Sequence, residues 1–215
     1  MINICVPTLN RYDKLNLLLD SLSNGSVLPD NIHILDNGGN LELSSTYKFN
    51  IHIVKPGYNM GVAASWNWFI KNVGEIRVIC NDDIIFEKDA LENFVKNSHK
   101  ELISSPDHLS LNVFSCFIFP DKMVELVGYF DENISPNYAY FEDNDYAYRL
   151  KLAGLCLYLV PNVKVIHDTS ATLKKFSSHE KSEHHRKFES ARKNYIKKWG
   201  GTPGNERFIT PYNGA

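Results

Sequence analysis

Strand-like and helix-like patterns alternate along the first 80 residues, and this alternation most limits the possible folds. Apolar runs with strand character cover residues 2–6, 31–36, 49–54 and 76–80. Leu15, Leu18 and Leu22 recur at helical spacing, and a second helical pattern covers residues 62–72. Strands that alternate with helices predict an α/β fold with a mostly parallel sheet, in which ligands bind outside the carboxyl ends of the strands.

The second half of the chain is less regular. We expect helices at residues 91–97, 123–127 and 146–153, and strands at 156–160, 163–166 and within 109–119. Asn10 is expected to cap the first helix. Residues 174–199 are basic, rich in histidine and predicted to be helical, and the residues after them are expected to be extended. Without a repeat or a low-complexity linker, the sequence predicts one domain over residues 1–170 and a helical extension over residues 171–215.

The bulk properties exclude several classes of protein. A chain of 215 residues with a formal charge of -2 gives no reason to expect a nucleic-acid partner. No apolar segment approaches the length of a membrane span, and the N-terminus reads as a strand instead of a signal peptide, so we expect a cytoplasmic protein. Cys5, Cys80, Cys116 and Cys156 stand singly in apolar stretches and are expected to be core residues.

Polar side chains gather where three of the expected strands end. They are residues 7–11, Asp36 with Asn37, and Asn81 with Asp82 and Asp83. Two adjacent carboxylates are expensive to bury unless they are paired or bind a metal. Taken alone, residues 81–83 fit a solvated turn equally well. Three polar clusters at one edge of a sheet favour a ligand site.

In their order along the chain, the motifs resemble glycosyltransferase family 2. The resemblance rests on residues 6–11, Asp36, residues 59–61, 81–83, 128–132 and 141–145, and His167, and residues 195–201 are similar to endings of bacterial and phage members. It covers roughly residues 1–170 and implies the GT-A fold, with a nucleotide-binding half over residues 1–86 and an acceptor-binding half over residues 87–170. It also implies transfer of a sugar from a UDP- or TDP-sugar to a hydroxyl of a glycan or lipid-linked acceptor, with inversion, as in polysaccharide biosynthesis.

The resemblance implies a divalent metal, Mn²⁺ or Mg²⁺, at the first acidic motif, residues 81–83. Such an ion neutralises the charge that builds on a departing diphosphate. Asp83 is the expected direct ligand, and Asp82 is expected to hold the ribose or the water shell of the metal. His167 would complete the metal shell, and its alternative role is a hydrogen bond at the end of a strand.

The nucleotide-sugar is expected to bind at the strand ends. The implied contacts are Pro7, Thr8, Asn10, Arg11, Asp36, Asn59, Gly61, Asn81 and Asp82. Asp36 would accept the imide N–H of a uracil or thymine base, or else initiate the turn at Asn37-Gly38, and the two roles are compatible.

The second acidic motif, residues 141–145, is expected to bind and activate the acceptor. An inverting transfer needs a base that takes the proton of the acceptor hydroxyl. The resemblance assigns this role to Asp143, with Glu142 or Asp145 binding acceptor hydroxyls. The alternative is that these acids only complement the dipole of the helix that they begin.

The basic C-terminal tail has three possible locations. Residues 174–198 would lie on the inner membrane face, pack against a second subunit, or pack their aromatic side chains onto the domain.

The activity has two alternatives to glycosyl transfer. A sugar-phosphate nucleotidyltransferase would also need a nucleotide-binding sheet and metal carboxylates, although residues 8–12 lack the glycine-rich loop that it usually has. A non-catalytic nucleotide-sugar binding module is the third possibility.

Overall fold

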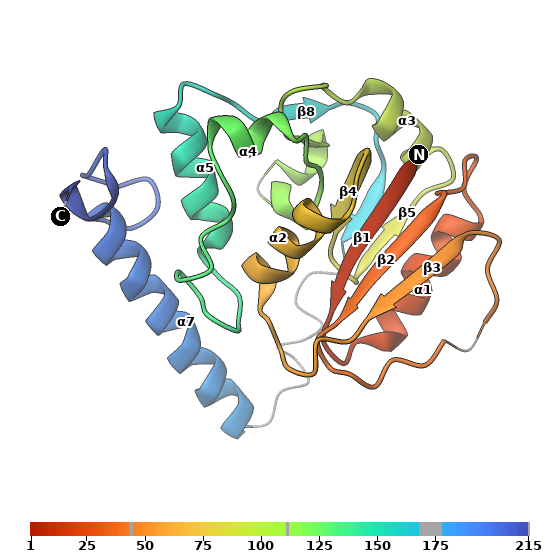
Figure 1. Ribbon diagram of the computed structural model, residues 1–215, viewed down its shortest axis with the longest axis horizontal. Coiled ribbons are helices and arrows are strands. Elements are labelled where there is room, and N and C mark those ends of the chain that lie inside the picture. The colour runs from red at the N-terminus through yellow and green to blue at the C-terminus, as the bar shows by residue number, and fades with distance from the viewer. Residues whose placement is uncertain (44, 111, 168–177, 215) are drawn as a thin grey trace.

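The computed structural model describes residues 1–43, 45–110, 112–167 and 178–214, and its centre is a seven-stranded sheet (Figure 1). The strand order is β3 (Asn50–Val54), β2 (Asn31–Asp36), β1 (Ile2–Thr8), β4 (Ile76–Cys80), β7 (Cys116–Ile118), β6 (Ser104–Pro106) and β8 (Tyr158–Val160). The first four are parallel, and β7 runs antiparallel to β4 and β6. The predicted mostly parallel α/β sheet is confirmed.

A second, two-stranded sheet pairs β5 (Ile84–Phe86) with β9 (Val165–His167). The pairing is antiparallel and sets His167 opposite Ile84. His167 therefore lies beside Asp83, the residue before β5, although the two are far apart in the sequence.

Helices cover both faces of the large sheet. The α-helices of the described residues are α1 (Tyr12–Ser23), α2 (Val62–Asn72), α3 (Ala90–Asn97), α4 (Lys122–Leu126), α5 (Glu142–Leu152) and α7 (Ser178–Trp199), of which α7 lies beyond α5. The leucines of α1 pack on one face against Ile4, Ile32 and Ile34. On the other face, Trp66 and Phe69 of α2 join Phe117 and Tyr146. Successive side chains of a strand point to opposite faces of the sheet, so a core is buried on each side.

The structure corrects four local predictions. Arg11, not Asn10, precedes α1, because Asn10 adopts the left-handed conformation with φ 58°. Within residues 109–119, two 3₁₀ turns (Asp107–Leu109 and Val113–Ser115) precede the short β7. A further 3₁₀ turn, Pro211–Gly214, replaces part of the expected extended end. Cys156 is exposed, whereas the other three cysteines are buried as predicted.

The long helix α7 lies alongside α5, at the end of the molecule opposite β3 (Figure 1). Tyr195 and Trp199 are buried, and their rings contact Phe141 and Tyr148. Of the three alternatives for the tail, the structure thus shows its aromatic residues packed onto the domain. The expected domain boundary at 170/171 and the expected helix start at Lys174 lie outside the described residues. None of the described helices is both long and apolar enough to cross a membrane.

Candidate active site

The carboxyl ends of β1 and β4 open into a cavity of about 320 Å³, here called the strand-end pocket. Eight of the residues predicted to bind nucleotide or metal line it: Pro7, Thr8, Arg11, Asn59, Gly61, Asn81, Asp82 and Asp83. Pro7 and Asp83, which are 76 positions apart in the sequence, meet here because parallel strands end at one edge of the sheet.

The two adjacent aspartates are buried and differ in their partners. Asp82 accepts a hydrogen bond from the Thr8 hydroxyl at 2.7 Å. Asp83 Oδ2 accepts one from Arg11 at 3.1 Å, and Asp83 Oδ1 lies 3.3 Å from His167 Nε2. Burial raises the pKa of Asp82 to about 6. Residues 81–83 do form a turn between β4 and β5, with the Ile84 N–H donating to the Asn81 carbonyl, but the turn is not solvated, because both aspartates are more than nine-tenths buried.

Asp83 Oδ1 and His167 Nε2, which lie 3.3 Å apart, fit a metal ion by their chemistry. Asp83 Oδ1 is buried and forms no hydrogen bond among the described residues. Carboxylate oxygens suit Mg²⁺ and Mn²⁺, and an imidazole nitrogen suits Mn²⁺ better. Within the described ranges, no three His, Cys, Asp or Glu side chains converge closely enough to hold a metal by themselves. The chemistry of these side chains thus fits an ion whose remaining ligands come from a substrate and water.

Asp36 lies outside the lining of the strand-end pocket. Its side chain is fully buried and accepts hydrogen bonds from the Tyr12 hydroxyl and from the backbone N–H groups of Gly38 and Leu41. These bonds form the turn that was its alternative role. The next residue, Asn37, does line the pocket, and its amide bonds Ser65 and the N–H of Met60.

Asn10 is a second predicted contact that does not line the pocket. It is exposed, and its side-chain oxygen accepts a 3.4 Å bond from Tyr12. Asn59 and Gly61 do line it, and Asn59 accepts a hydrogen bond from the Gly61 N–H, which shapes the entry into α2.

The wall opposite the strand ends comes from the loop of residues 135–141 and from α7. Tyr138, Ala139, Tyr140 and His184 line the strand-end pocket there. The loop is fixed on α2, because the Val62 N–H donates to the Tyr138 carbonyl at 2.7 Å. Sequence reasoning missed Tyr138, Tyr140 and His184. Asn37 was placed in a polar cluster at a strand end together with Asp36, but no contact was assigned to it.

A second cavity, of about 260 Å³ and here called the α5 pocket, adjoins the first. Glu142 and Asp143, at the start of α5, line it. Val62, Asn81, Ala139 and Tyr140 line both cavities, so the two cavities share a boundary. The structure thus brings the second acidic motif next to the strand-end pocket.

The two acids of the α5 pocket lie in different surroundings. Glu142 is 5% exposed, and its Oε2 is buried without a hydrogen-bond partner in the described part of the chain. Burial, followed by the charge of Asp143, raises the pKa of Glu142 to about 8. Burial also raises the pKa of Asp143, whose Oδ1 accepts a 2.7 Å bond from the Asn144 N–H. Glu142 is therefore mostly protonated at neutral pH.

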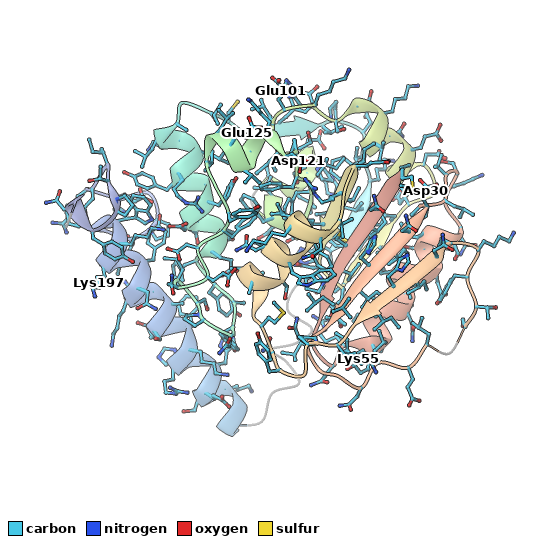
Figure 2. The ribbon with its side chains drawn as sticks, in the orientation of Figure 1. Asp30, Lys55, Glu101, Asp121, Glu125 and Lys197 are labelled. Atoms are coloured by element: carbon cyan, nitrogen blue, oxygen red, sulfur yellow. The ribbon has the colours of Figure 1, made fainter. Side chains whose placement is uncertain are left out.

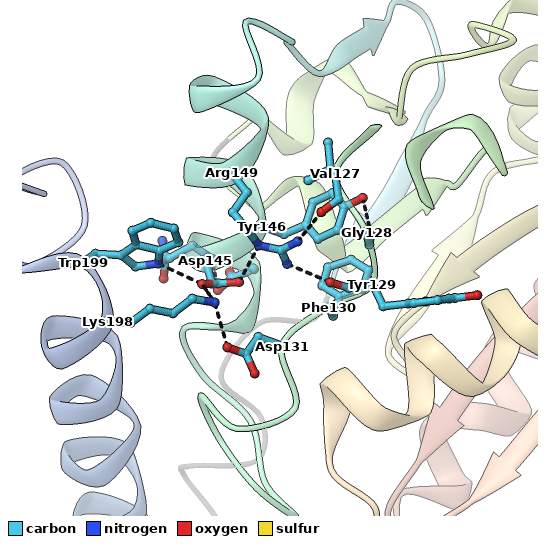
Figure 3. A network of polar contacts seen from close by, with 12 residues as sticks. Val127, Gly128, Tyr129, Phe130, Asp131, Asp145, Tyr146, Arg149, Lys198 and Trp199 are labelled. Carbon is cyan, nitrogen blue, oxygen red and sulfur yellow. Dashed lines mark hydrogen bonds and ion pairs between the residues drawn. The ribbon is translucent and has the colours of Figure 1, made fainter. Parts of the chain in front are cut away.

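Asp145, expected to bind acceptor hydroxyls, lines neither cavity, and its carboxylate faces Arg149, Lys198 and Trp199 (Figure 3). It is fully buried, with Oδ2 2.9 Å from Arg149 Nε. Its Oδ1 lies 2.6 Å from Lys198 Nζ and accepts a 2.8 Å bond from the Trp199 indole. With its oxygens held by these three side chains, Asp145 has a structural role, which corrects the expectation.

Comparisons with known proteins agree with this geometry. The family model "Glycosyl transferase family 2" matches residues 3–104. Searching curated proteins gave no sequence match.

Two solved structures share the fold. The mannosyltransferase PcManGT from Pyrobaculum calidifontis, in complex with GDP-Man and Mn²⁺, has 17% identity and a TM-score of 0.58, and the match covers 79% of this chain and 57% of that one. TarS from S. aureus has 14% identity and a TM-score of 0.54, over 75% of this chain and 35% of that one. At these identities the likeness establishes the fold, and the chain spans 57% or less of either structure. The predicted GT-A fold is thereby confirmed, and residues 3–104 of this chain are similar to glycosyl transferase family 2.

Proposed function

We propose that this protein transfers a sugar from a nucleotide-sugar donor to a hydroxyl of an acceptor, with inversion at the anomeric carbon and with a divalent cation. The shared boundary of the two cavities carries the proposal. Asp83 lines one of them, Asp143 lines the other, and four residues line both. A sugar at the shared boundary would have its leaving diphosphate on one side and an acceptor hydroxyl on the other, which is the arrangement that inversion needs.

The strand-end pocket is proposed as the donor site. Arg11 and Thr8 would hold the nucleotide side, and Asp83, Asp82 and His167 would hold Mn²⁺ or Mg²⁺ together with the diphosphate. The ion would supply neutralisation of the charge that develops on the leaving group. The buried Asp83 Oδ1, which lies beside His167 and forms no hydrogen bond among the described residues, supports this assignment, and so does the Mn²⁺ bound with GDP-Man in the PcManGT structure.

The donor nucleotide is proposed to be UDP or TDP, as the resemblance implies. Asp36 then acts through the turn that it holds, because its buried carboxylate already accepts three hydrogen bonds. Asn37 is the side chain of this turn that lines the pocket, and it is proposed to face the base. Its amide retains one N–H and one lone pair beyond the bonds to Ser65 and Met60.

The α5 pocket is proposed as the acceptor site, for a hydroxyl of a glycan or of a lipid-linked glycan. Asp143 is the proposed general base, since it lines the cavity and is only partly buried. Glu142 has a pKa raised by burial to about 8, so at neutral pH it would donate a hydrogen bond to the acceptor instead of taking its proton.

Donor binding and product release test the proposal together. Thermal shift with UDP-, TDP-, GDP- and CDP-sugars, each with and without Mn²⁺, should show a Mn²⁺-dependent rise in Tm for a pyrimidine donor. Asp143→Asn should keep this shift and lose transfer by a factor of at least about 100, the usual range for a general base. Near-normal transfer by Asp143→Asn would contradict the base assignment. Release of pyrophosphate from UTP and a sugar phosphate would instead establish nucleotidyl transfer.

A further inference from the structure

Tyr140 stands at the boundary where the proposed donor and acceptor sites meet. It is one of the four residues that line both cavities, and among them it alone is aromatic. Val62 and Ala139 offer only small apolar surfaces, whereas a phenol ring offers a sugar both an apolar face and a polar hydroxyl. If the proposed function holds, the transferred sugar has to lie against this boundary, and Tyr140 is the side chain best suited to contact it.

The backbone at Tyr140 is held in an uncommon conformation. Tyr140 has φ 92° and Phe141 has φ 69°, both in the left-handed region that bulky residues rarely adopt. The surrounding contacts fix it: the Ser135 hydroxyl donates to the Ala139 carbonyl at 2.6 Å, and the Phe141 ring contacts Phe188 and Tyr195 of α7. Strain of this kind persists where neighbouring structure determines the position of a functional side chain.

His184 of α7 fixes the side chain as well. Its Nε2 lies 2.6 Å from the Tyr140 hydroxyl, and the two rings meet edge to face at 5.3 Å. The Phe188 ring packs against Tyr140 from the next turn of the helix, at 5.1 Å. His184 also lines the strand-end pocket. Whichever partner donates the shared proton, this bond sets the orientation of the phenol group toward the cavity.

We propose that Tyr140 contacts the transferred sugar and that His184 is the positioning residue that holds Tyr140, so that the C-terminal helix takes part in selecting the donor sugar. This assignment rests on the proposed function. It adds a contribution from His184 of α7, a residue outside the family-matched residues 3–104 and outside the motifs of the sequence.

Binding measurements separate the sugar contact from the nucleotide contact and need no acceptor. Calorimetry with Mn²⁺ would compare UDP, UDP-glucose and UDP-galactose on wild type, Tyr140→Phe, His184→Ala and His184→Gln. We expect the Kd for UDP to change less than twofold in every variant. The preference between the two epimeric donors should fall at least fivefold in His184→Ala and Tyr140→Phe, and His184→Gln, which keeps a hydrogen-bonding group, should retain part of it.

The neighbouring His185 provides a matched control, because it is an exposed histidine on the same helix. His185→Ala should behave as wild type in all three titrations. If His184→Ala and Tyr140→Phe match this control, the inference is overturned while the proposed function stands. If they lose UDP affinity in parallel with donor affinity, their role is merely structural and the inference is again overturned. If the wild-type protein binds none of the three compounds, the proposed UDP donor is wrong. The same comparison would then use GDP and two GDP-sugars that are epimers of each other.

Discussion

Lys198 Nζ lies 2.6 Å from Oδ1 of Asp145, so a buried ion pair joins the end of α7 to the first turn of α5 (Figure 3). Lys198 also lies 2.7 Å from Asp131, and Arg149 holds the second oxygen of Asp145 while donating to the carbonyls of Val127 and Tyr129. Glu142 and Asp143 stand three and two residues before Asp145 in the chain. The network thus fixes the start of α5, on which the proposed acceptor side chains lie.

Removing the lysine should destabilise the fold. Lys198→Met leaves Asp145 and Asp131 buried with one cation fewer, and breaking a buried pair in this way costs about 3 kcal/mol. Urea unfolding should show a loss of that size in the free energy of unfolding. Lys197→Met is the matched control, because Lys197 is exposed and points away from the body (Figure 2). Its effect should stay within about 0.5 kcal/mol. Equal effects of the two substitutions would contradict a stabilising role for the network.

The first half of the fold could be predicted from local patterns, whereas this network could not. β2 and α2 have the predicted bounds because each presents an apolar face with a clear period. Asp145, in contrast, looked like an acceptor residue because it stands in an acidic motif. Its partners Lys198 and Trp199 are more than 50 residues away and have no local pattern that connects them to it. Burial decides the role of an acid, and burial depends on tertiary contacts.

The same limit applies to the candidate site. Asp82 and Asp83 were predictable because parallel strands that end together bring their polar ends together. Tyr140 and His184 were missed because their proximity depends on a loop with two positive φ values and on the placement of a helix beyond the family-matched residues. Asp36 has the position that was predicted for it, but its alternative role, in the turn, is the one that the hydrogen bonds show.

Glu142 should make stability depend on pH. Its pKa is raised from the usual 4.5 to about 8 in the folded protein, so between these values the unfolded chain loses the proton and the folded chain keeps it. The free energy of unfolding therefore falls as pH rises through this window, by at most about 1.4 kcal/mol per pH unit. Glu142→Gln removes the titrating group. In urea unfolding, the free energy of unfolding of the variant relative to wild type should rise by on the order of 2 to 4 kcal/mol from pH 5 to pH 8. A difference between variant and wild type that does not change with pH would refute the raised pKa.

Gly61 should tolerate no side chain. Its φ is +82°, and a Cβ would lie 2.5 Å from the Tyr138 backbone nitrogen and 2.7 Å from its carbonyl oxygen. Gly61→Ala must therefore move the loop of residues 135–141 away from α2, which would break the bond from the Val62 N–H. We expect a loss of about 2 kcal/mol or more in the free energy of unfolding. Gly57→Ala is the control, since Gly57 also has a positive φ, +83°, but open space around the Cβ position. The difference between the two losses in the free energy of unfolding measures the effect of the close approach of the loop at Gly61.

Asp83 should control metal binding. If its unpartnered Oδ1 contacts the ion, Asp83→Asn removes a charge and weakens Mn²⁺ binding, because oxygen ligands of Mn²⁺ bind most strongly when they are ionised. Titration followed by the electron paramagnetic resonance signal of free Mn²⁺, with UDP present, should show at least a tenfold rise in the Kd for Mn²⁺. Asp89→Asn serves as the control, because Asp89 is exposed and lines neither cavity. Since Arg11 is bonded to the other oxygen of Asp83, a Tm within a few degrees of wild type is needed to assign the weaker binding to the lost ligand. Unchanged Mn²⁺ affinity in a folded Asp83→Asn variant would place the ion elsewhere and leave the carboxylate as the anchor of Arg11.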